Sequence, residues 1–318
     1  MTSPRGTQFE LYGLNELAES TPPSGNWLRL PIVSADLGGT QDLVAETTLS
    51  RALGRNAPEP FHNNLEVPIS VEVPMDRGNL GFWLTLMFGA ATTTGAGPFT
   101  DVWTPRSAGT ALPTASLEGR IASAAVTRFH LRSAVKANTL AIRVDPTAGL
   151  QTMSVGLIGR AATDSASSVA GTPTTATFLG HLKQRWVVSV DNIAVGNVTG
   201  LELNISNGLD PYMTVRDQPT GAAFAIDEGA LEITGSFTFR SADSRFFDDA
   251  EALTSRELTL LNTIATNDHL TLDMGNVFLA RPSAPVQGPG AIQQTVRFRA
   301  AFDTSDTTMF TATRVRSA

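Results

Sequence analysis

The sequence predicts a mainly β protein made of two similar blocks in tandem, each interrupted by one short helix. Three observations point to this: apolar and polar residues alternate through many short segments, two helical patterns occur at equivalent places, and the order of these elements repeats. Period-two alternation is typical of a strand with one buried face. The chain of 318 residues is long enough for two domains of about 150 residues each.

The clearest alternation lies in residues 65–73 and residues 231–239, where nearly every second residue is apolar. Shorter stretches of the same kind are residues 140–144, 186–190, 201–205 and 295–299. Pro68 and Pro74 fall in the first stretch. Because proline is confined to sheet edges, strand starts and bulges, we expect this strand to lie at an edge or to end early.

A helical pattern follows each of the two long alternating stretches. In the first, Asp76 is placed to cap the helix and Gly89 to stop it, and the apolar residues at i, i+3, i+4 and i+7 are Leu80, Trp83, Leu84 and Met87. In the second, which begins near Asp243, the apolar stripe consists of Phe246, Phe247, Ala250 and Leu253. The carboxylates near its start suit the helix dipole and are interpreted as a solvated helix start rather than metal ligands: Asp248, Asp249 and Glu251.

These elements suggest an internal repeat. Residues 65–67 match residues 231–233 at an offset of 166, residues 49–53 match 205–209 at 156, and residues 149–151 match 291–293 at 142. The loop of residues 210–230 is longer than its counterpart, residues 54–64. Two unrelated β blocks are the alternative to duplication. We expect an N-terminal arm (1–26), a first domain (27–162), a linker (163–180) and a second domain (181–318).

Composition narrows the possible functions. With 23 basic and 30 acidic residues the net charge is −7, which disfavours tight binding to a phosphate backbone. Only 17% of residues are charged, against about 25% on average, so much of the surface is expected to be neutral polar or buried between subunits. All cationic residues except Lys136 and Lys183 are arginines, which suits fixed interfacial contacts but also fits the codon bias of a GC-rich genome.

Neither a membrane segment nor a secretion signal is expected. The first 20 residues contain no long apolar core, and the longest apolar run, residues 81–91, is far shorter than the ~20 residues that a membrane helix needs. We therefore expect synthesis in a bacterial cytoplasm and no membrane binding by this subunit.

Catalytic and metal-binding patterns are weak. No nucleophile elbow, phosphate-binding loop, dinucleotide fingerprint or zinc-protease motif occurs, the chain has no cysteine, and the four histidines are scattered. Residues 302–305 (FDTS) resemble half of an aspartic protease signature, but no second half accompanies them. We therefore expect no enzyme activity, no cofactor and no metal. Arg297 and Arg299 share one strand face, which could meet solvent, a neighbouring subunit or an anionic polymer.

One stretch carries a resemblance to a known family. Residues 198–209 (VTGLELNISNGL), followed by residues 231–239 (LEITGSFTF), resemble the phage tail tube proteins, in which a strand ending in N-x-L precedes a long loop, a second strand and a short helix. The N-terminal part fits the same order through residues 49–51, 67–73 and 153–159.

The resemblance implies two tandem β-sandwich domains of the tail tube type, each flanked by a short helix. Three such chains would form a ring with pseudo-sixfold symmetry and a continuous inner β-barrel, whereas single-domain relatives form hexamers. The rings would stack into a tube in the virion through which double-stranded DNA passes without sequence-specific binding. The implied partners are other copies of the chain, the tape measure, the terminator and the baseplate or tip. A virion fibre or baseplate module that binds a receptor or carbohydrate is the alternative, and an esterase or peptidase on an unfamiliar β fold is a further rival.

Two sets of residues are candidates for assembly contacts. For stacking between rings they lie in the two long loops: Asp210, Tyr212, Arg216, Asp217, Phe224, Asp227, Arg55 and Phe61. For the lumen or the contact between subunits they lie on predicted strands: Arg297, Arg299, Glu66, Glu72 and Glu232. The terminal arm and residues 163–177 are second choices for stacking.

Overall fold

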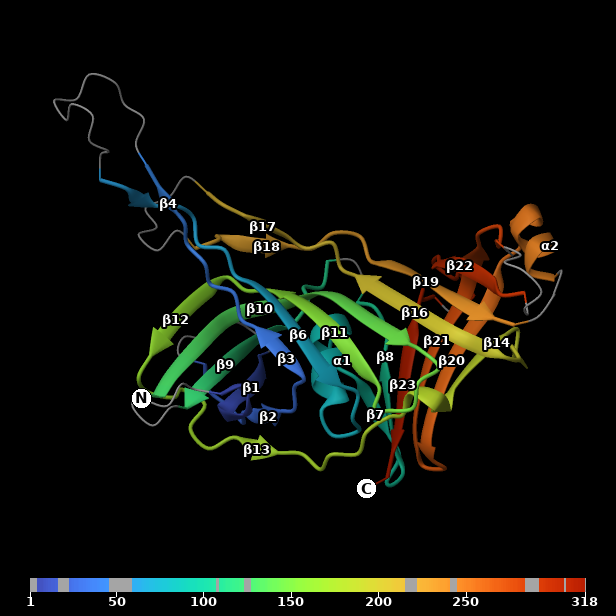
Figure 1. Ribbon diagram of the computed structural model, residues 1–318, viewed down its shortest axis with the longest axis horizontal. Helices are drawn as coiled ribbons and strands as arrows, with labels where there is room; N and C mark the ends of the chain where they lie inside the picture. The colour runs from blue at the N-terminus through green and yellow to red at the C-terminus, as the bar shows by residue number, and fades with distance from the viewer. Residues whose placement is uncertain are drawn as a thin grey trace, which may run out of the picture.

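A computed structural model of the chain describes residues 5–16, 23–45, 59–106, 109–122, 127–214, 222–240, 245–283, 292–305 and 307–317. The molecule is elongated, with the N-terminal and C-terminal parts of the chain at opposite ends and a set of long strands crossing the middle (Figure 1). We call β1 to β12 the N-terminal half and β14 to β23 the C-terminal half.

The N-terminal half contains one α-helix and twelve strands among the described residues. In chain order, after the 3-10 turn Gly6–Gln8, they are β1 (Phe9–Glu16), β2 (Leu28–Leu30), β3 (Ser34–Asp36), β4 (Leu43–Val44), β5 (Phe61–His62), β6 (Pro68–Pro74), α1 (Leu80–Phe88), β7 (Thr92–Thr94), β8 (Phe99–Trp103), β9 (Thr114–Ala122), β10 (Thr127–Val144), β11 (Thr152–Ile158) and β12 (Ala161–Ser165).

The connection and the C-terminal half also consist mainly of strands, with one 3-10 turn and one α-helix among the described residues. They comprise β13 (Thr174–Thr175), the 3-10 turn Lys183–Arg185, β14 (Trp186–Val190), β15 (Ile193–Ala194), β16 (Val198–Ser206), β17 (Asp210–Tyr212), β18 (Ala225–Asp227), β19 (Glu232–Phe239), α2 (Arg245–Ala252), β20 (Arg256–Ala265), β21 (Asp268–Leu279), β22 (Gln294–Ala300) and β23 (Thr311–Arg316). The protein is thus mainly β, as the sequence predicts.

The pattern of strand pairing occurs twice. Eight antiparallel pairs of the N-terminal half belong to this pattern: β1–β2, β1–β9, β9–β10, β10–β11, β10–β12, β6–β11, β3–β6 and β4–β5. In the C-terminal half they are β14–β15, β14–β20, β20–β21, β21–β22, β21–β23, β19–β22, β16–β19 and β17–β18. Each pair of the first set has a counterpart in the second, and each helix follows the equivalent strand, β6 or β19.

One sheet runs through both halves because β10 pairs with β16. Its order is β3-β6-β11-β10-β16-β19-β22-β21, four strands from each half. One hydrophobic core lies under this sheet and includes residues on both sides of the β10–β16 contact, such as Ile142 and Leu203. The two halves therefore fold around a shared core.

The helix α1 begins near where the sequence predicts. The Asp76 carboxylate accepts a hydrogen bond from the backbone N–H of Asn79 at 3.1 Å, although Asn79 rather than Asp76 holds the N-cap position. Gly89 ends the helix with a φ of 104°, a left-handed conformation that glycine adopts without strain. Leu80, Trp83, Leu84 and Met87 are all buried, as expected.

Several expectations differ from the structure. Residues 1–26 are not simply an arm, since β1 pairs with β9 and Leu11 is fully buried. The expected linker contains β12 and β13, which pair with β10 and β2. The strand with the two prolines is not an edge, because β6 lies between β3 and β11, but it does begin at Pro68 and end at Pro74.

The second helix also departs from expectation. Leu253 is 71% exposed instead of lying on the apolar stripe, because the helix ends at Ala252. Asp249 is buried and its carboxylate accepts a hydrogen bond from Nε of Arg256 at 3.0 Å, so it is not part of a solvated helix start. Its role is to bind the first residue of the next strand. Asp243 lies outside the described residues, and so do residues 49–53, part of the proposed repeat.

Candidate assembly surfaces

The long sheet has one buried face and one open, polar face. Across all eight strands a single row of paired residues lies on the same side, because directly opposite residues of antiparallel strands share a face. The row reads Ser34, Glu72, Ser154, Ala141, Asn204, Thr234, Arg299 and Phe278. Most of these side chains are small and uncharged, so the open face is a continuous polar surface that crosses both halves.

Charges on the open face are nearly balanced. Where these strands pair within the long sheet, the acidic residues on this face are Asp36, Glu72, Glu202 and Glu232, and the basic ones are Lys136, Arg143, Arg297 and Arg299. Arg143 pairs with Glu202 across the β10–β16 contact, and Arg299 lies 3.2 Å from Glu232. Because these pairs are exposed, each contributes about 0–1 kcal/mol to stability. Their main effect is to cancel local charge.

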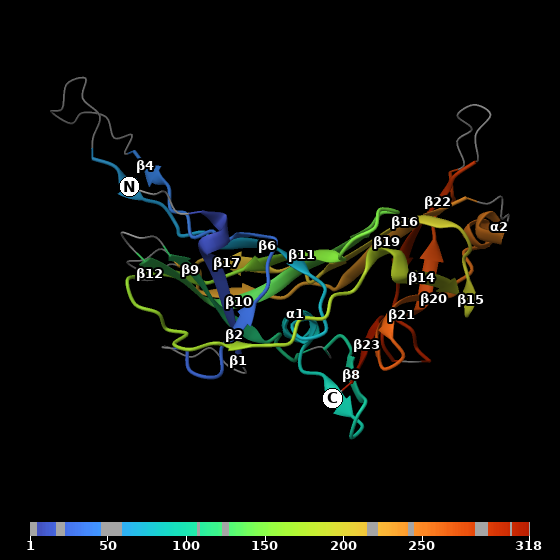
Figure 2. The same ribbon diagram turned by 60° about the horizontal axis from the view of Figure 1, so that its bottom comes forward.

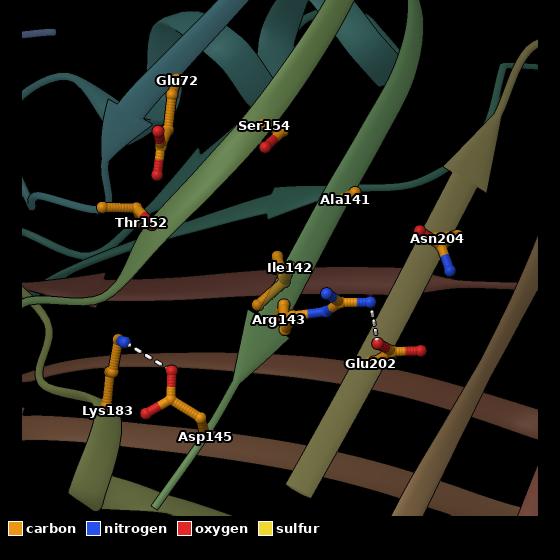
Figure 3. A pocket seen from close by; sticks show the side chains of 10 residues that line it. All are labelled: Glu72, Ala141, Ile142, Arg143, Asp145, Thr152, Ser154, Lys183, Glu202 and Asn204. Atoms are coloured by element: carbon orange, nitrogen blue, oxygen red, sulfur yellow. Dashed lines mark hydrogen bonds and ion pairs between the residues drawn. The ribbon is translucent and has the colours of Figure 1, made fainter. Parts of the chain in front are cut away.

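A shallow pocket of about 410 Å³ lies on this face where the halves meet (Figure 3). Figure 3 shows Glu72 and Ser154 on one side and Arg143 reaching toward Glu202 on the other. At its rim Lys183 Nζ lies 2.7 Å from Asp145. Hydrogen bonds from Lys183 and Thr147 lower the pKa of the Asp145 carboxyl to about 2. The lining is mainly polar, and four of its charged side chains pair as Arg143 with Glu202 and Lys183 with Asp145, so it is not an apolar ligand site.

All five strand candidates from the sequence reach this face. Glu72, Glu232, Arg297 and Arg299 point to it from β6, β19 and β22, and Glu66 bridges Thr40 just before β6. Sequence reasoning missed Arg143, Glu202, Asn204 and Ser154. The alternation of polar and apolar residues in β10 and β16 shows that Arg143, Glu202 and Asn204 lie on a polar strand face. It does not reveal that the two strands are neighbours.

The long-loop candidates lie partly on two hairpins. Asp210 and Tyr212 lie in β17, and Asp227 pairs with Asp210 from β18. The rings of Tyr212 and Phe224 are 5.7 Å apart. Phe61, in the equivalent hairpin β4–β5, is 55% exposed. Arg55, Arg216 and Asp217 lie outside the described residues. In Figures 1 and 2, β4 extends away from the main body, and β17 and β18 run along one border of the sheet in Figure 1.

A second contact joins the halves beneath the sheet. The hairpin of β7 and β8 lies between α1 and β9 and has no counterpart after α2, and β8 pairs with β23. At this contact the buried Asp101 carboxylate accepts hydrogen bonds from Arg314 at 2.7 Å and Arg316 at 2.8 Å. Burial raises the pKa of Asp101, but hydrogen bonds from Arg316, Thr93 and Arg314 outweigh it and lower the pKa to about 2. We call β7–β8 with Asp101, Arg314 and Arg316 the clasp.

Histidine and tryptophan side chains, which enzymes and receptors commonly use, are buried at several positions in this structure. His181 is buried, its Nδ1 lies 2.9 Å from Oδ1 of Asn262, and burial lowers its pKa. Trp83 and Trp103 are buried in the shared core, and Trp27 is buried in a smaller cluster with Tyr12 and Leu14. Within the part of the chain that the structure describes, no group of three or more histidine or acidic side chains is placed to hold a metal ion, and no helix is long and apolar enough to cross a bilayer.

The described residues thus form two similar β halves that share one long sheet with a polar face. The family model for phage tail tube proteins matches residues 12–300. The chain therefore belongs to the phage tail tube protein family, a family of structural proteins of the virion tail. A search of curated proteins gave no match.

Proposed function

We propose that three copies of the chain form a ring, and that the rings stack into a tube whose channel conducts DNA from the capsid to the host. The single observation that carries this proposal is the open polar face, which continues across four strands of each half. The two halves act as tandem tube domains, so three chains supply six equivalent wall segments. The matching strand pairings of the two halves support this reading.

The polar face is the wall of the channel in this proposal. Its opposite side packs on the core and is inaccessible to DNA. The face carries neutral Ser, Thr, Asn and Ala side chains, and its arginines are largely held by glutamates. Since phosphate binding needs free basic groups, such a wall offers DNA few places to adhere. Passing DNA is therefore conducted and not retained.

The hairpins β4–β5 and β17–β18 are the proposed contacts between stacked rings. Each hairpin follows a strand of the long sheet, β3 or β16, a few residues later in the chain. Each carries exposed apolar groups, including Phe61 and Phe224. A contact of one ring with the next through different surfaces does not close on itself and so gives a filament. Other tail proteins would meet the ends of this filament.

Negative-stain electron microscopy of the purified chain tests the proposal. We expect rings or tubes with a central hole, and isolated single chains at high protein concentration would contradict it. Deleting residues 212–226 is expected to give rings that no longer stack. Tubes of normal length from that deletion would overturn the role of the β17–β18 hairpin and leave the ring intact.

A further inference from the structure

We propose that the ring closes by repeating, between chains, the pairing that β10 and β16 make within one chain. The segment Thr40–Gln41, which follows β3, pairs with Ala280–Arg281, which follows β21, of the next copy. This inference rests on the proposed function and assigns the two edges and the register of the contact between chains.

The contact inside the chain provides the template. Six residue pairs join β10 to β16, from Thr139 opposite Ser206 to Val144 opposite Leu201. The ladder extends by one bond in which the N–H of Asn207 donates to the carbonyl of Asn138 at 2.8 Å. The Asn207 side chain is buried, and its Nδ2 donates to the carbonyls of Ala137 at 2.9 Å and Met87 at 3.1 Å. Asn207 thus fastens the C-terminal half to the N-terminal half.

The edge strand β3 has the register of β16. Ser34 pairs with Glu72 as Gly200 pairs with Thr238, 166 positions later in both strands. The same offset relates the bridge of Thr40 with Glu66 to the pair of Ser206 with Glu232. Gln41 therefore stands where Asn207 stands in the other half, and both residues carry a carboxamide.

The end of β21 has the register of the end of β10. Ser283 bridges Thr295 as Ala141 pairs with Ser154, at offsets of 142 and 141. Before this point Val277 pairs with Arg256 as Val135 pairs with Ala115, at the same offsets. At an offset of 142, Arg281 corresponds to Thr139 and Ala280 to Asn138.

No strand that the structure describes covers either edge, although Arg132 donates to the carbonyls of Leu37 and Gly38 just before Thr40. Among the described residues β3 pairs only with β6, and the ladder between β20 and β21 stops at Val277. Thr40, Ala280 and Arg281 are exposed. An edge with free backbone groups is a template for pairing with another chain.

An apolar groove beside β3 strengthens the case for a protein partner there. It has a volume of about 440 Å³, and its apolar side chains are Phe9, Ile32, Val33, Ala35 and Ile121. Val33 is 57% exposed. At the offset of 166, Ala35 corresponds to Leu201, which is buried and lies opposite Val144 of the other half. A second copy at the β3 edge would cover the equivalent surface.

Disulfide trapping tests the register, because the chain has no cysteine of its own. Asn207 and Asn138 form the hydrogen-bonded side of the template, so Thr139 and Ser206 form the adjacent non-hydrogen-bonded pair, whose Cα atoms lie about 4.5 Å apart. This spacing lies within the range that a disulfide bridges. The equivalent pair between chains is Thr40 with Arg281.

The full-length chain carrying Thr40→Cys and Arg281→Cys is oxidised after assembly and run on a denaturing gel without reductant. We expect dimer and trimer bands in which most of the chain is cross-linked. The positive control, Thr139→Cys with Ser206→Cys, gives a cross-link within single chains. The out-of-register control, Thr40→Cys with Ser283→Cys, gives at least about tenfold less product, since its two sites lie on a diagonal about 7–8 Å apart.

The outcomes separate this inference from the proposed function. Tubes or rings that form while Thr40→Cys with Arg281→Cys stays uncross-linked, although the positive control cross-links, overturn the assigned edges and leave the tube function standing. A chain that never assembles overturns both.

The variant Gln41→Ala adds a readout without cysteine. Losing one buried amide contact is expected to raise the concentration needed for ring formation roughly tenfold, which corresponds to about 1.4 kcal/mol. Gln41→Ala also removes the exposed hydrogen bond from Gln41 to the carbonyl of Asn63, so the midpoint of monomer unfolding should move only slightly, and far less than in Asn207→Ala. Unchanged assembly of Gln41→Ala would contradict the equivalence with Asn207.

Discussion

The edges of β16 and β3 occupy equivalent places in the two halves, yet only β16 is paired on both sides. β16 lies between β19 and β10, whereas β3 has β6 on one side and no strand on the other among the described residues. Asn207 is buried at the first edge, and Gln41 at the second donates to the carbonyl of Asn63 in its own hairpin. Equivalent strand edges therefore have different roles in the two halves: the β16 edge joins the halves within the chain, whereas the β3 edge is left without a neighbouring strand among the described residues.

A second difference predicts that the internal joint is stronger than the proposed contact between chains. The β7–β8 hairpin exists only in the N-terminal half, and it reaches across to β23 to form the clasp. The equivalent hairpin after α2 is missing, so an identical contact between chains would lack a clasp. Under the proposed ring, three clasped joints therefore alternate with three unclasped ones, and the ring opens at the unclasped joints.

Breaking the clasp should have the largest effect on the single chain. Asp101→Asn leaves Arg314 buried without its counter-ion, and loss of one partner of a buried ion pair costs about 3–5 kcal/mol. Denaturant unfolding measures this loss. The matched control Asp248→Asn removes an exposed carboxylate from α2 and should change stability by less than about 0.5 kcal/mol. A loss for Asp101→Asn no larger than that of the control would show that the clasp is not a structural joint.

The same carboxylate should make stability depend on pH in the acid range. The pKa of Asp101 in the folded protein is about 2, below the ordinary value of 3.8 for an aspartate, so its contribution to stability is present above about pH 4 and is lost as pH falls toward 2. The shift corresponds to about 2 kcal/mol. The difference in unfolding free energy between wild type and Asp101→Asn should shrink by about 2 kcal/mol over this window. A difference between them that stays constant from pH 5 to pH 2 would contradict this assignment.

Asn207→Ala should weaken the internal joint by about 1–2 kcal/mol, because the carbonyls of Ala137 and Met87 lose their donor. Thermal unfolding of Asn207→Ala and Gln41→Ala compares the two equivalent amides directly. We expect a lower melting temperature for Asn207→Ala alone. Equal losses would mean that the β3 edge is already as well packed as the β16 edge.

Removing an exposed charge should have the smallest effect on the free energy of unfolding. Arg143→Gln removes the ion pair with Glu202 across the β10–β16 contact, and exposed pairs contribute about 0.2–1 kcal/mol. The loss should vanish in 1 M salt, where screening is strong. A loss above 2 kcal/mol in unfolding experiments would show that this pair carries the joint in place of the backbone ladder.

The sequence predicted those strands and helices that are marked by a pattern of neighbouring residues. The alternation of residues 67–73 and 231–239 marked β6 and β19, and the i, i+3, i+4, i+7 spacing from Leu80 marked α1. The offset of 166 recurs in the structure as the register of β3–β6 and β16–β19. These features depend on neighbours within a few residues or on comparing two stretches of the chain.

Features that depend on distant contacts were missed. The polar composition of residues 1–26 predicted an arm, but Glu10 binds Arg120 and the buried Glu16 accepts a hydrogen bond from Ser116, both on β9. The β10–β16 contact and the clasp join residues up to 215 positions apart, and no local pattern encodes them. The sequence therefore predicted individual strands of the polar face, but it did not predict that these strands form one continuous sheet.

Cryo-electron microscopy of the assembled particle tests most directly whether the two halves act as equivalent segments of one wall. We expect three chains in each ring, six similar segments around the channel, and the polar face with Glu72, Asn204 and Arg299 turned inward. Six chains in each ring, or the same face turned outward, would contradict the account.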